Sequence, residues 1–135
     1  MLEDHRGAKL HPECLEAVQN AAKLCANLGH IVEEANPSID MVALRPMTAR
    51  ISAANTARSC NMRWKVLGWQ PNVDDVEAVT WAVYQRGLKV SGVEYIQAIA
   101  AAHAAGRKMA AFLTSYDVIL STTLAGPPPK LGYFD

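Results

Sequence analysis

Apolar residues recur at helical spacing in several segments of this chain. Between residues 12 and 29 they return at three- and four-residue steps, which places them along one face of a helix. The spacing predicts a helix that begins near Pro12, since proline is well tolerated in a first turn. Gly29 should end it, because glycine suits the left-handed conformation after a helix. The predicted stripe consists of Cys14, Val18, Ala21, Ala22, Cys25 and Leu28.

A second helical stripe follows Pro46. Proline disfavours helical angles in the residue before it, so we expect this long helix to start at about Pro46. Gly68 is expected to end it, and the sequence GWQPN that begins there is typical of a turn. The predicted stripe consists of Ala53, Ala57, Cys60, Trp64 and Leu67.

Two further helix starts carry capping-box patterns. Asp74 and Glu77 fit the box in its Asp form, and Ser91 and Glu94 fit the stricter Ser form. The helix from Ser91 to about Thr114 is apolar on several sides, which predicts that protein covers more than one of them. Its apolar positions are Ile96, Ile99, Ala102, Met109, Ala110, Phe112 and Leu113.

Two short β-branched segments lie outside these helices. Ile31 and Val32 form the first, and the sequence VILSTTL from Val118 forms the second, so both segments predict strands. Three prolines after the second favour an extended polyproline course. The predicted fold class is α/β, with helices packed on a few strands of an incomplete mixed sheet. Two strands alone are marginal, so residues 1–135 are predicted to be a single partial domain.

Charge and hydrophobicity narrow the possible partners. Thirteen basic and thirteen acidic residues cancel, so no global field favours nucleic acid or an anionic membrane. Half of the 135 residues are hydrophobic, which suits a packed globular body. Neither a membrane span nor a secretory signal is visible, so the cytoplasm is the predicted location. The best basic cluster spreads around a helix axis and is interpreted as a solvated face: Arg45, Arg50, Arg58, Arg63 and Lys65.

The three cysteines are typical of a reducing compartment. Cys14 and Cys25 lie eleven residues apart on one predicted helix face. Helical rise separates them by about 16 Å, which exceeds disulfide reach. Cys60 falls on the second stripe, so a core role is favoured over the alternative of a reactive thiol.

The residue patterns contain no complete catalytic constellation. Six serines lack a G-x-S-x-G frame, and eight glycines form neither G-x-G nor G-K-[ST]. Histidines and cysteines lack metal-ligand spacing, so no metal is predicted. His103 is interpreted as a core histidine, with a pocket residue as the alternative. Trp64, Trp69 and Trp81 could line a site for an apolar ligand. Core packing is favoured for Trp64, which lies on the helix stripe, and Trp69, which follows a helix-ending glycine, is kept as the candidate substrate-binding residue.

Four segments in this order resemble the C-terminal half of the amidase signature family. They are HPECLEAVQNAAKLCANLGHIVEEANP, ISAANTARSC, DDVEAVTWAVYQRGLKVSGVEYIQAI and YDVILSTTLAGPPPKLGYFD, and they cover nearly all the chain from His11. The resemblance is to the branch that includes 6-aminohexanoate-cyclic-dimer hydrolases. It implies that a serine nucleophile, a second serine held by a cis peptide and a lysine hydrolyse a small-molecule amide without metal or organic cofactor.

The family's catalytic residues have no counterpart in this sequence. The chain contains neither a Gly-Gly nor a Ser-Ser pair, and none of its six lysines matches the catalytic one. The resemblance therefore implies a fragment of an amidase that is inactive alone. Its pocket wall is expected at Thr122 and Thr123, where the family often has threonine–proline–threonine, and at Trp69.

The alternative function is a non-catalytic binding or oligomerisation module. Apolar surface left by a missing half of an enzyme would associate with a second copy or with that half. Neither function requires nucleic acid or a membrane as a partner.

Overall fold

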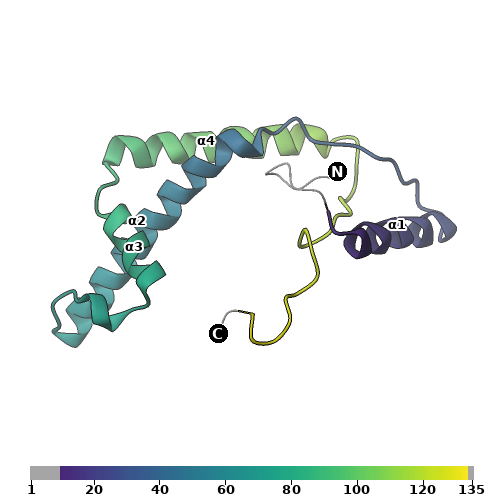
Figure 1. Cartoon of the computed structure of the whole chain (residues 1–135). Helices are drawn as coiled ribbons and strands as arrows, with labels where there is room; N and C mark the ends of the chain where they lie inside the picture. Colours follow the sequence, from purple (N-terminus) through teal and green to yellow (C-terminus); the bar gives the residue numbers. More distant parts are fainter. Residues whose placement is uncertain (1–9, 134–135) are drawn as a thin grey trace. The chain divides into compact units, whose positions relative to one another are not determined.

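A computed structural model describes residues 10–133, and within them each regular element is a helix (Figure 1). The chain divides into two compact units. Unit 1 combines the residues up to Ile39 with those from Met109 onward, and unit 2 runs from Asp40 to Lys108. Over the described residues the elements are α1 (Pro12–Asn27), α2 (Met41–Leu67), the 3₁₀ helix η1 (Val73–Asp75), α3 (Ala78–Gly87) and α4 (Gly92–Phe112).

The prediction of an α/β fold with an incomplete mixed sheet is wrong, because residues 10–133 contain no strand. Ile31 lies in irregular backbone and is 92% exposed. The VILSTTL segment is also irregular, and Val118 is 80% exposed. β-Branched residues are favoured in strands because their side chains pack well on a pleated, half-buried surface. A strand also needs a neighbouring strand with which it forms ladder hydrogen bonds. The described chain gives neither segment such a neighbour.

In unit 1, the ends of α1 confirm the prediction. Pro12 is its first residue, and the His11 Nδ1 atom accepts a 3.4 Å hydrogen bond from the Glu13 amide. Gly29 has a φ of 92°, the left-handed conformation expected after the helix. The stripe is only half-buried, and Leu28 is 70% exposed. The half-buried members are Cys14, Val18, Ala21, Ala22 and Cys25.

Long-range hydrogen bonds connect separate segments of unit 1 within the residues that the structure describes. The His11 amide donates to the Ala125 carbonyl oxygen at 2.8 Å, which fixes the start of α1 beside the proline-rich segment. The Tyr116 hydroxyl donates to a Glu33 carboxylate oxygen at 3.2 Å. The second bond, rather than a β-ladder, connects residues that neighbour the two segments expected to form strands.

In unit 2, α2 begins five residues before the predicted start. The Asp40 carboxylate caps it by accepting a 2.8 Å hydrogen bond from the Ala43 amide, and Pro46 lies inside the helix. Pro46 cannot donate a backbone bond to the preceding turn, but at this position it removes only one bond from a 27-residue helix. The predicted end is confirmed, since Gly68 has a left-handed φ of 69°.

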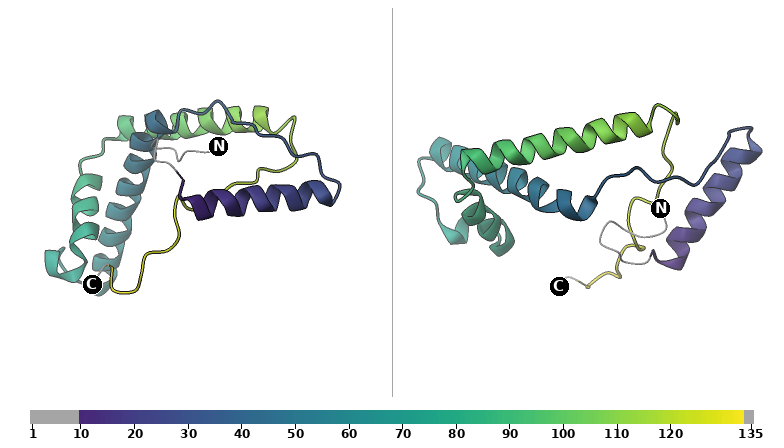
Figure 2. Two further views of the ribbon diagram at one scale, coloured as in Figure 1. Left: turned by 45° about the vertical axis from the view of Figure 1, so that its right-hand side comes forward. Right: turned by 90° about the horizontal axis from the view of Figure 1, so that it is seen from above.

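The core of unit 2 lies between α2 and α3, which run side by side (Figure 2). Trp64 and Tyr84 are each 4% exposed, and their rings meet edge to face with centroids 5.2 Å apart. Trp81 packs against the same two rings. Ala57 is buried in the same cluster, and Ala53 is buried against Gly87 of α3, so the predicted stripe of α2 is confirmed except at Leu67, which is 37% exposed.

One of the two predicted capping boxes is confirmed. The Glu94 amide donates to Ser91 Oγ at 3.2 Å, and the Ser91 amide donates to Glu94 Oε2 at 2.9 Å. The predicted box at Asp74 and Glu77 is wrong, because α3 begins after Glu77 and no side chain caps it. Asn72 instead caps η1 by accepting a hydrogen bond from the Asp74 amide at 3.3 Å.

The expectation that protein covers α4 on several sides is wrong for part of the helix. Ala98 is fully buried, whereas Val93 and Ile96 are 67% and 69% exposed. None of the helices described in residues 10–133 has the length and hydropathy that a membrane crossing would require.

Candidate functional site

Trp69 lies directly after the end of α2 in unit 2. Its amide donates a 2.9 Å hydrogen bond to the Trp64 carbonyl oxygen, which holds its backbone against the last turn of the helix. Its indole is 55% exposed. The side chain is therefore free to contact a ligand or another protein surface, as aromatic residues with a polar edge commonly do.

Thr122 and Thr123 lie in the irregular segment of unit 1. Thr122 is half-buried and Thr123 is exposed. The two residues are neighbours in the chain, whereas Trp69 belongs to unit 2. That the three residues line one substrate pocket stays a prediction.

The other candidates from the sequence have structural explanations. Cys60 is half-buried and packs against the cluster of Trp64 and Tyr84, which confirms its core role. His103 is exposed on α4, so its interpretation as a core histidine is wrong. Within the residues that the structure describes, no group of three His, Cys, Asp or Glu side chains is placed to hold a metal ion.

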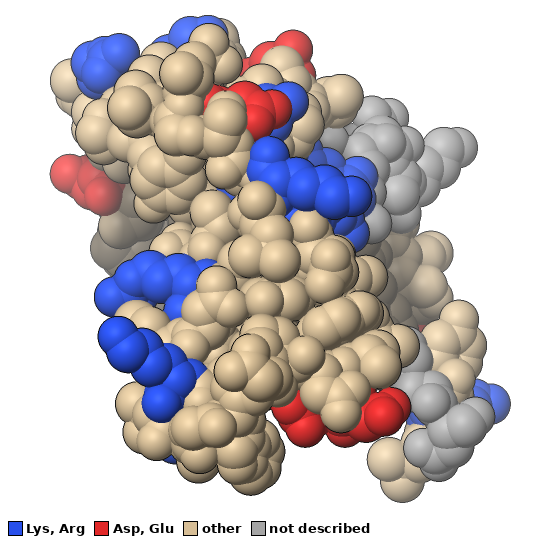
Figure 3. All heavy atoms as spheres, turned by 90° about the vertical axis from the view of Figure 1, so that its left-hand side faces the viewer, with Lys and Arg blue, Asp and Glu red and all other residues tan. Residues whose placement is uncertain are grey.

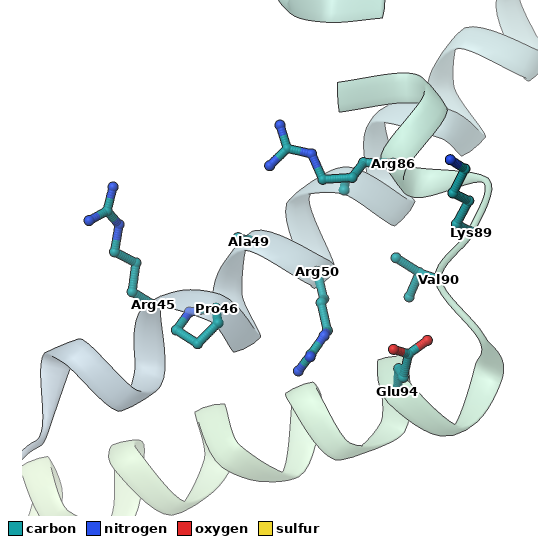
Figure 4. Close-up of a pocket in the computed structure, with 9 residues that line it drawn as sticks. Arg45, Pro46, Ala49, Arg50, Arg86, Lys89, Val90 and Glu94 are labelled. Carbon is teal, nitrogen blue, oxygen red and sulfur yellow. The ribbon is translucent and has the colours of Figure 1, made fainter. Parts of the chain in front are cut away.

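An open cleft of about 540 Å³ lies within unit 2, which the sequence alone did not reveal. Its walls come from the first half of α2, the end of α3 with the following turn, and the start of α4 (Figure 4). Only tertiary structure brings these three segments together, so helical spacing on α2 could not indicate it. The lining residues are Arg45, Pro46, Ala49, Arg50, Ala53, Arg86, Lys89, Val90 and Glu94.

A close contact between α2 and α3 fixes the shape of the cleft. Gly87 is buried, and a Cβ atom placed on it would overlap the Ala53 backbone and lie 2.8 Å from the Ala57 Cβ atom. Hydrogen bonds from the Lys89 amide to the Arg86 carbonyl and from the residue 90 amide to the Gly87 carbonyl close the following turn, at 3.1 and 3.2 Å. The absence of a side chain at Gly87 therefore positions Arg86 and Lys89 over the cleft.

Positive charge dominates the lining of the cleft. Four cations and one carboxylate give a net charge of +3, from 4 − 1, on a chain whose formal net charge is zero. Figure 3 shows several basic side chains, and fewer acidic ones, on one face of the molecule. The sequence prediction of a solvated basic face on α2 omitted Arg86 and Lys89, which α3 and its following turn contribute.

The one carboxylate of the cleft, Glu94, is held by its capping box. Hydrogen bonds from the backbone and side chain of Ser91 lower its pKa below the ordinary value, with a smaller contribution from the positive charge of Arg50. Arg50 is half-buried and points toward α4, and its Nη1 atom donates to Met47 Sδ at 3.1 Å. Arg50 and Glu94 thus face the same gap between α2 and α4 (Figure 4).

Comparison with known protein families gives a match along the whole chain. The family model described as Amidase matches residues 1–135. The chain is also 27% identical over 126 residues to the 6-aminohexanoate-cyclic-dimer hydrolases of Paenarthrobacter ureafaciens and of Pseudomonas sp. strain NK87. Each alignment covers 91% of this chain and 25% of the relative, so the chain spans about a quarter of the length of these relatives.

Solved structures show the same relationship at the level of the fold. The structure of 6-aminohexanoate cyclic dimer hydrolase complexed with substrate matches with a TM-score of 0.77 and 24% identity, over 84% of this chain and 24% of that chain. A second structure of 6-aminohexanoate cyclic dimer hydrolase matches the same shares with a TM-score of 0.69. The helical arrangement described above therefore has a counterpart in part of those hydrolases.

Proposed function

Because this chain belongs to the amidase family, we propose that it forms a helical portion of an enzyme that hydrolyses carbon–nitrogen amide bonds. The match of the amidase family model to all 135 residues carries this proposal. Residues 1–135 then act as a single partial domain, and their substrate is a small linear or cyclic amide. The names of the relatives, which act on a cyclic dimer of 6-aminohexanoate, support that substrate class.

We further propose that the 135 residues alone do not hydrolyse amides. Acyl transfer to a serine needs a positioned base and hydrogen-bond donors aimed at the developing oxyanion. Ser91 is used in the capping box, where its hydroxyl donates to Glu94 at 2.8 Å. The sequence also lacks the paired glycines and paired serines expected for the catalytic segment of the family.

The contribution of this chain to such an enzyme is structural and extends to the substrate pocket. Trp69, Thr122 and Thr123 are the residues proposed for the pocket wall. The exposed indole of Trp69 offers apolar area, and the threonine hydroxyls offer hydrogen bonds to an amide group.

A hydrolysis assay tests the absence of activity. The purified chain is incubated with simple amides and with 6-aminohexanoate cyclic dimer, beside the Paenarthrobacter ureafaciens hydrolase as a positive control. We expect no turnover above the blank for the chain alone. Turnover that disappears on replacement of any one serine by alanine would contradict the proposal.

A chimera tests the positive part of the proposal. The matching quarter of the Paenarthrobacter ureafaciens hydrolase is replaced by this chain, and we expect measurable hydrolysis of an amide. A chimera with a cooperative melt and no activity on any amide tested would contradict membership of a hydrolytic enzyme.

The second candidate function is assembly, and the exposed apolar side chains of unit 2 favour it. Val66 is 76% exposed and Val79 is 66% exposed, in addition to Val93 and Ile96 on α4. Large exposed apolar patches favour association. Sedimentation velocity should then show a dimer or larger species at micromolar concentration, and a monomer at all concentrations would exclude self-assembly.

The cytoplasm stays the predicted location. Cys14, Cys25 and Cys60 are free thiols, which is the state that a reducing compartment maintains.

A further inference from the structure

Two arginines flank one face of α2 at the cleft of unit 2. Arg45 lies in the second turn of α2 and Arg86 lies in the last turn of α3. Figure 4 shows both side chains extending to the same side of α2, with Ala49 between them. Ala49 is exposed and carries only a methyl side chain.

The positive charge on this side of α2 is not balanced by a carboxylate of the cleft. Glu94 is its one acidic lining residue, and it faces α4 together with Arg50. Arg45 and Arg86 are exposed, and Lys89 adds a third cation at the rim. A guanidinium group presents parallel N–H donors that match two oxygens of a phosphate or carboxylate group.

We propose that Arg45, Arg86 and Lys89 bind a small multivalent oxyanion, meaning a compound with two or more phosphate or carboxylate groups. All three residues are among those that line the open cleft of unit 2. Binding is electrostatic, so added salt weakens it. This site is separate from amide hydrolysis and does not depend on the proposed function.

The turn after α3 gives the site a fixed second side. The contact of Gly87 with Ala53 sets the distance between the two backbones, and the closed turn holds Lys89 near Arg86. The backbone positions are thus set before a ligand binds. Only the three exposed side chains lose conformational freedom, at a cost that limits the affinity to a modest value.

Titration of the full 135-residue chain with pyrophosphate, and separately with citrate, tests the site. The heat of binding or the NMR chemical-shift changes are measured at constant ionic strength. The proteins compared are the wild type and the variants Arg45→Gln, Arg86→Gln and Arg58→Gln. Arg58 is an exposed arginine of α2 that does not line the cleft, so its variant removes the same charge elsewhere. We expect each cleft variant to weaken binding about tenfold and Arg58→Gln to leave it nearly unchanged.

The two anions distinguish the sources of the oxyanion. Binding of pyrophosphate alone assigns the site to phosphate compounds, and binding of both anions assigns it to multivalent oxyanions in general. Absence of saturable binding, or equal weakening by all three variants, would overturn the proposal. Circular dichroism checks that the variants fold, and Arg45→Lys and Arg86→Lys, which keep the charge and lose the paired donors, should bind with intermediate affinity.

Discussion

Trp64 and Asp75 are joined by a hydrogen bond of 2.7 Å from the indole Nε1 atom to a carboxylate oxygen. The bond connects the last turns of α2 to η1, across the turn that contains Trp69. Trp64 is 4% exposed, so its N–H group is placed where few water molecules reach it. Asp75, the neighbour of the predicted cap residue Asp74, thus provides the acceptor for a buried donor.

Replacing Asp75 by alanine should therefore destabilise unit 2. The loss leaves the buried indole N–H of Trp64 without its acceptor, which costs about 1–3 kcal/mol in the free energy of unfolding. This change in the free energy of unfolding is measured by urea denaturation, monitored by tryptophan fluorescence. Asp74→Ala is the matched control, because the same charge is removed from the neighbouring residue, and it should change stability far less. Equal effects of the two substitutions would show that net charge, rather than the hydrogen bond, matters.

Gly87→Ala should also destabilise the chain. The added Cβ atom would overlap the Ala53 carbonyl group, and backbone atoms cannot move aside as a flexible side chain can. Overpacking of this kind typically costs about 1–3 kcal/mol.

Gly106→Ala is the control for that substitution, since Gly106 lies inside α4 and nothing surrounds its missing Cβ atom within 4 Å. Alanine is favoured over glycine in a helix interior, so the free energy of unfolding of this variant should increase by about 0.5–1 kcal/mol. The melting temperature should therefore fall for Gly87→Ala and rise for Gly106→Ala. A loss of stability at Gly106 comparable to that at Gly87 would contradict the packing argument.

The sequence predicted local features well because they depend on neighbouring residues. Gly29 and Gly68 end their helices as expected, and the Ser91–Glu94 box forms because both partners lie within one turn. The start of α2 was predicted wrongly, because proline is typical of a first helical turn and Pro46 therefore indicates a start there. The helix is instead capped by Asp40, six residues earlier.

Features that depend on distant partners were not predictable in the same way. The segments at Ile31 and Val118 have the composition of strands, but pairing is a property of a neighbour that the described chain does not supply. The cleft joins Arg45 to Arg86, forty-one positions apart, through the contact of Gly87 with α2. Nothing in the local pattern around either arginine indicates that contact.

The stabilising effect of the capping box should depend on pH. Hydrogen bonds from Ser91 lower the pKa of Glu94 in the folded chain, so folding favours its ionised form. This contribution is present above the pKa of the unfolded chain and is lost as the pH falls through the lower, folded value. The difference in unfolding free energy between wild type and Glu94→Gln should shrink between neutral pH and pH about 3. A difference that stays constant over that range would contradict the assignment.

The hydrogen bond between Tyr116 and Glu33 should make Tyr116 titrate at a higher pH than an ordinary tyrosine, because it raises the pKa of the phenol. The Tyr116 hydroxyl donates a hydrogen bond to the Glu33 carboxylate, and this bond raises the pKa of Tyr116 above the ordinary value, with smaller contributions from desolvation and from the negative charge of Glu33. Its stabilising contribution is therefore fully present below pH about 10 and is lost as the pH rises through the pKa of Tyr116 in the folded chain.

Phenolate absorbance, measured as the difference between wild type and Tyr116→Phe, isolates the titration of Tyr116. Glu33→Gln should return its pKa toward the ordinary value, whereas Glu34→Gln, which removes the adjacent charge, should leave most of the increase. An equal decrease in both variants would mean that general negative charge, and not the hydrogen bond joining the two segments of unit 1, sets the titration.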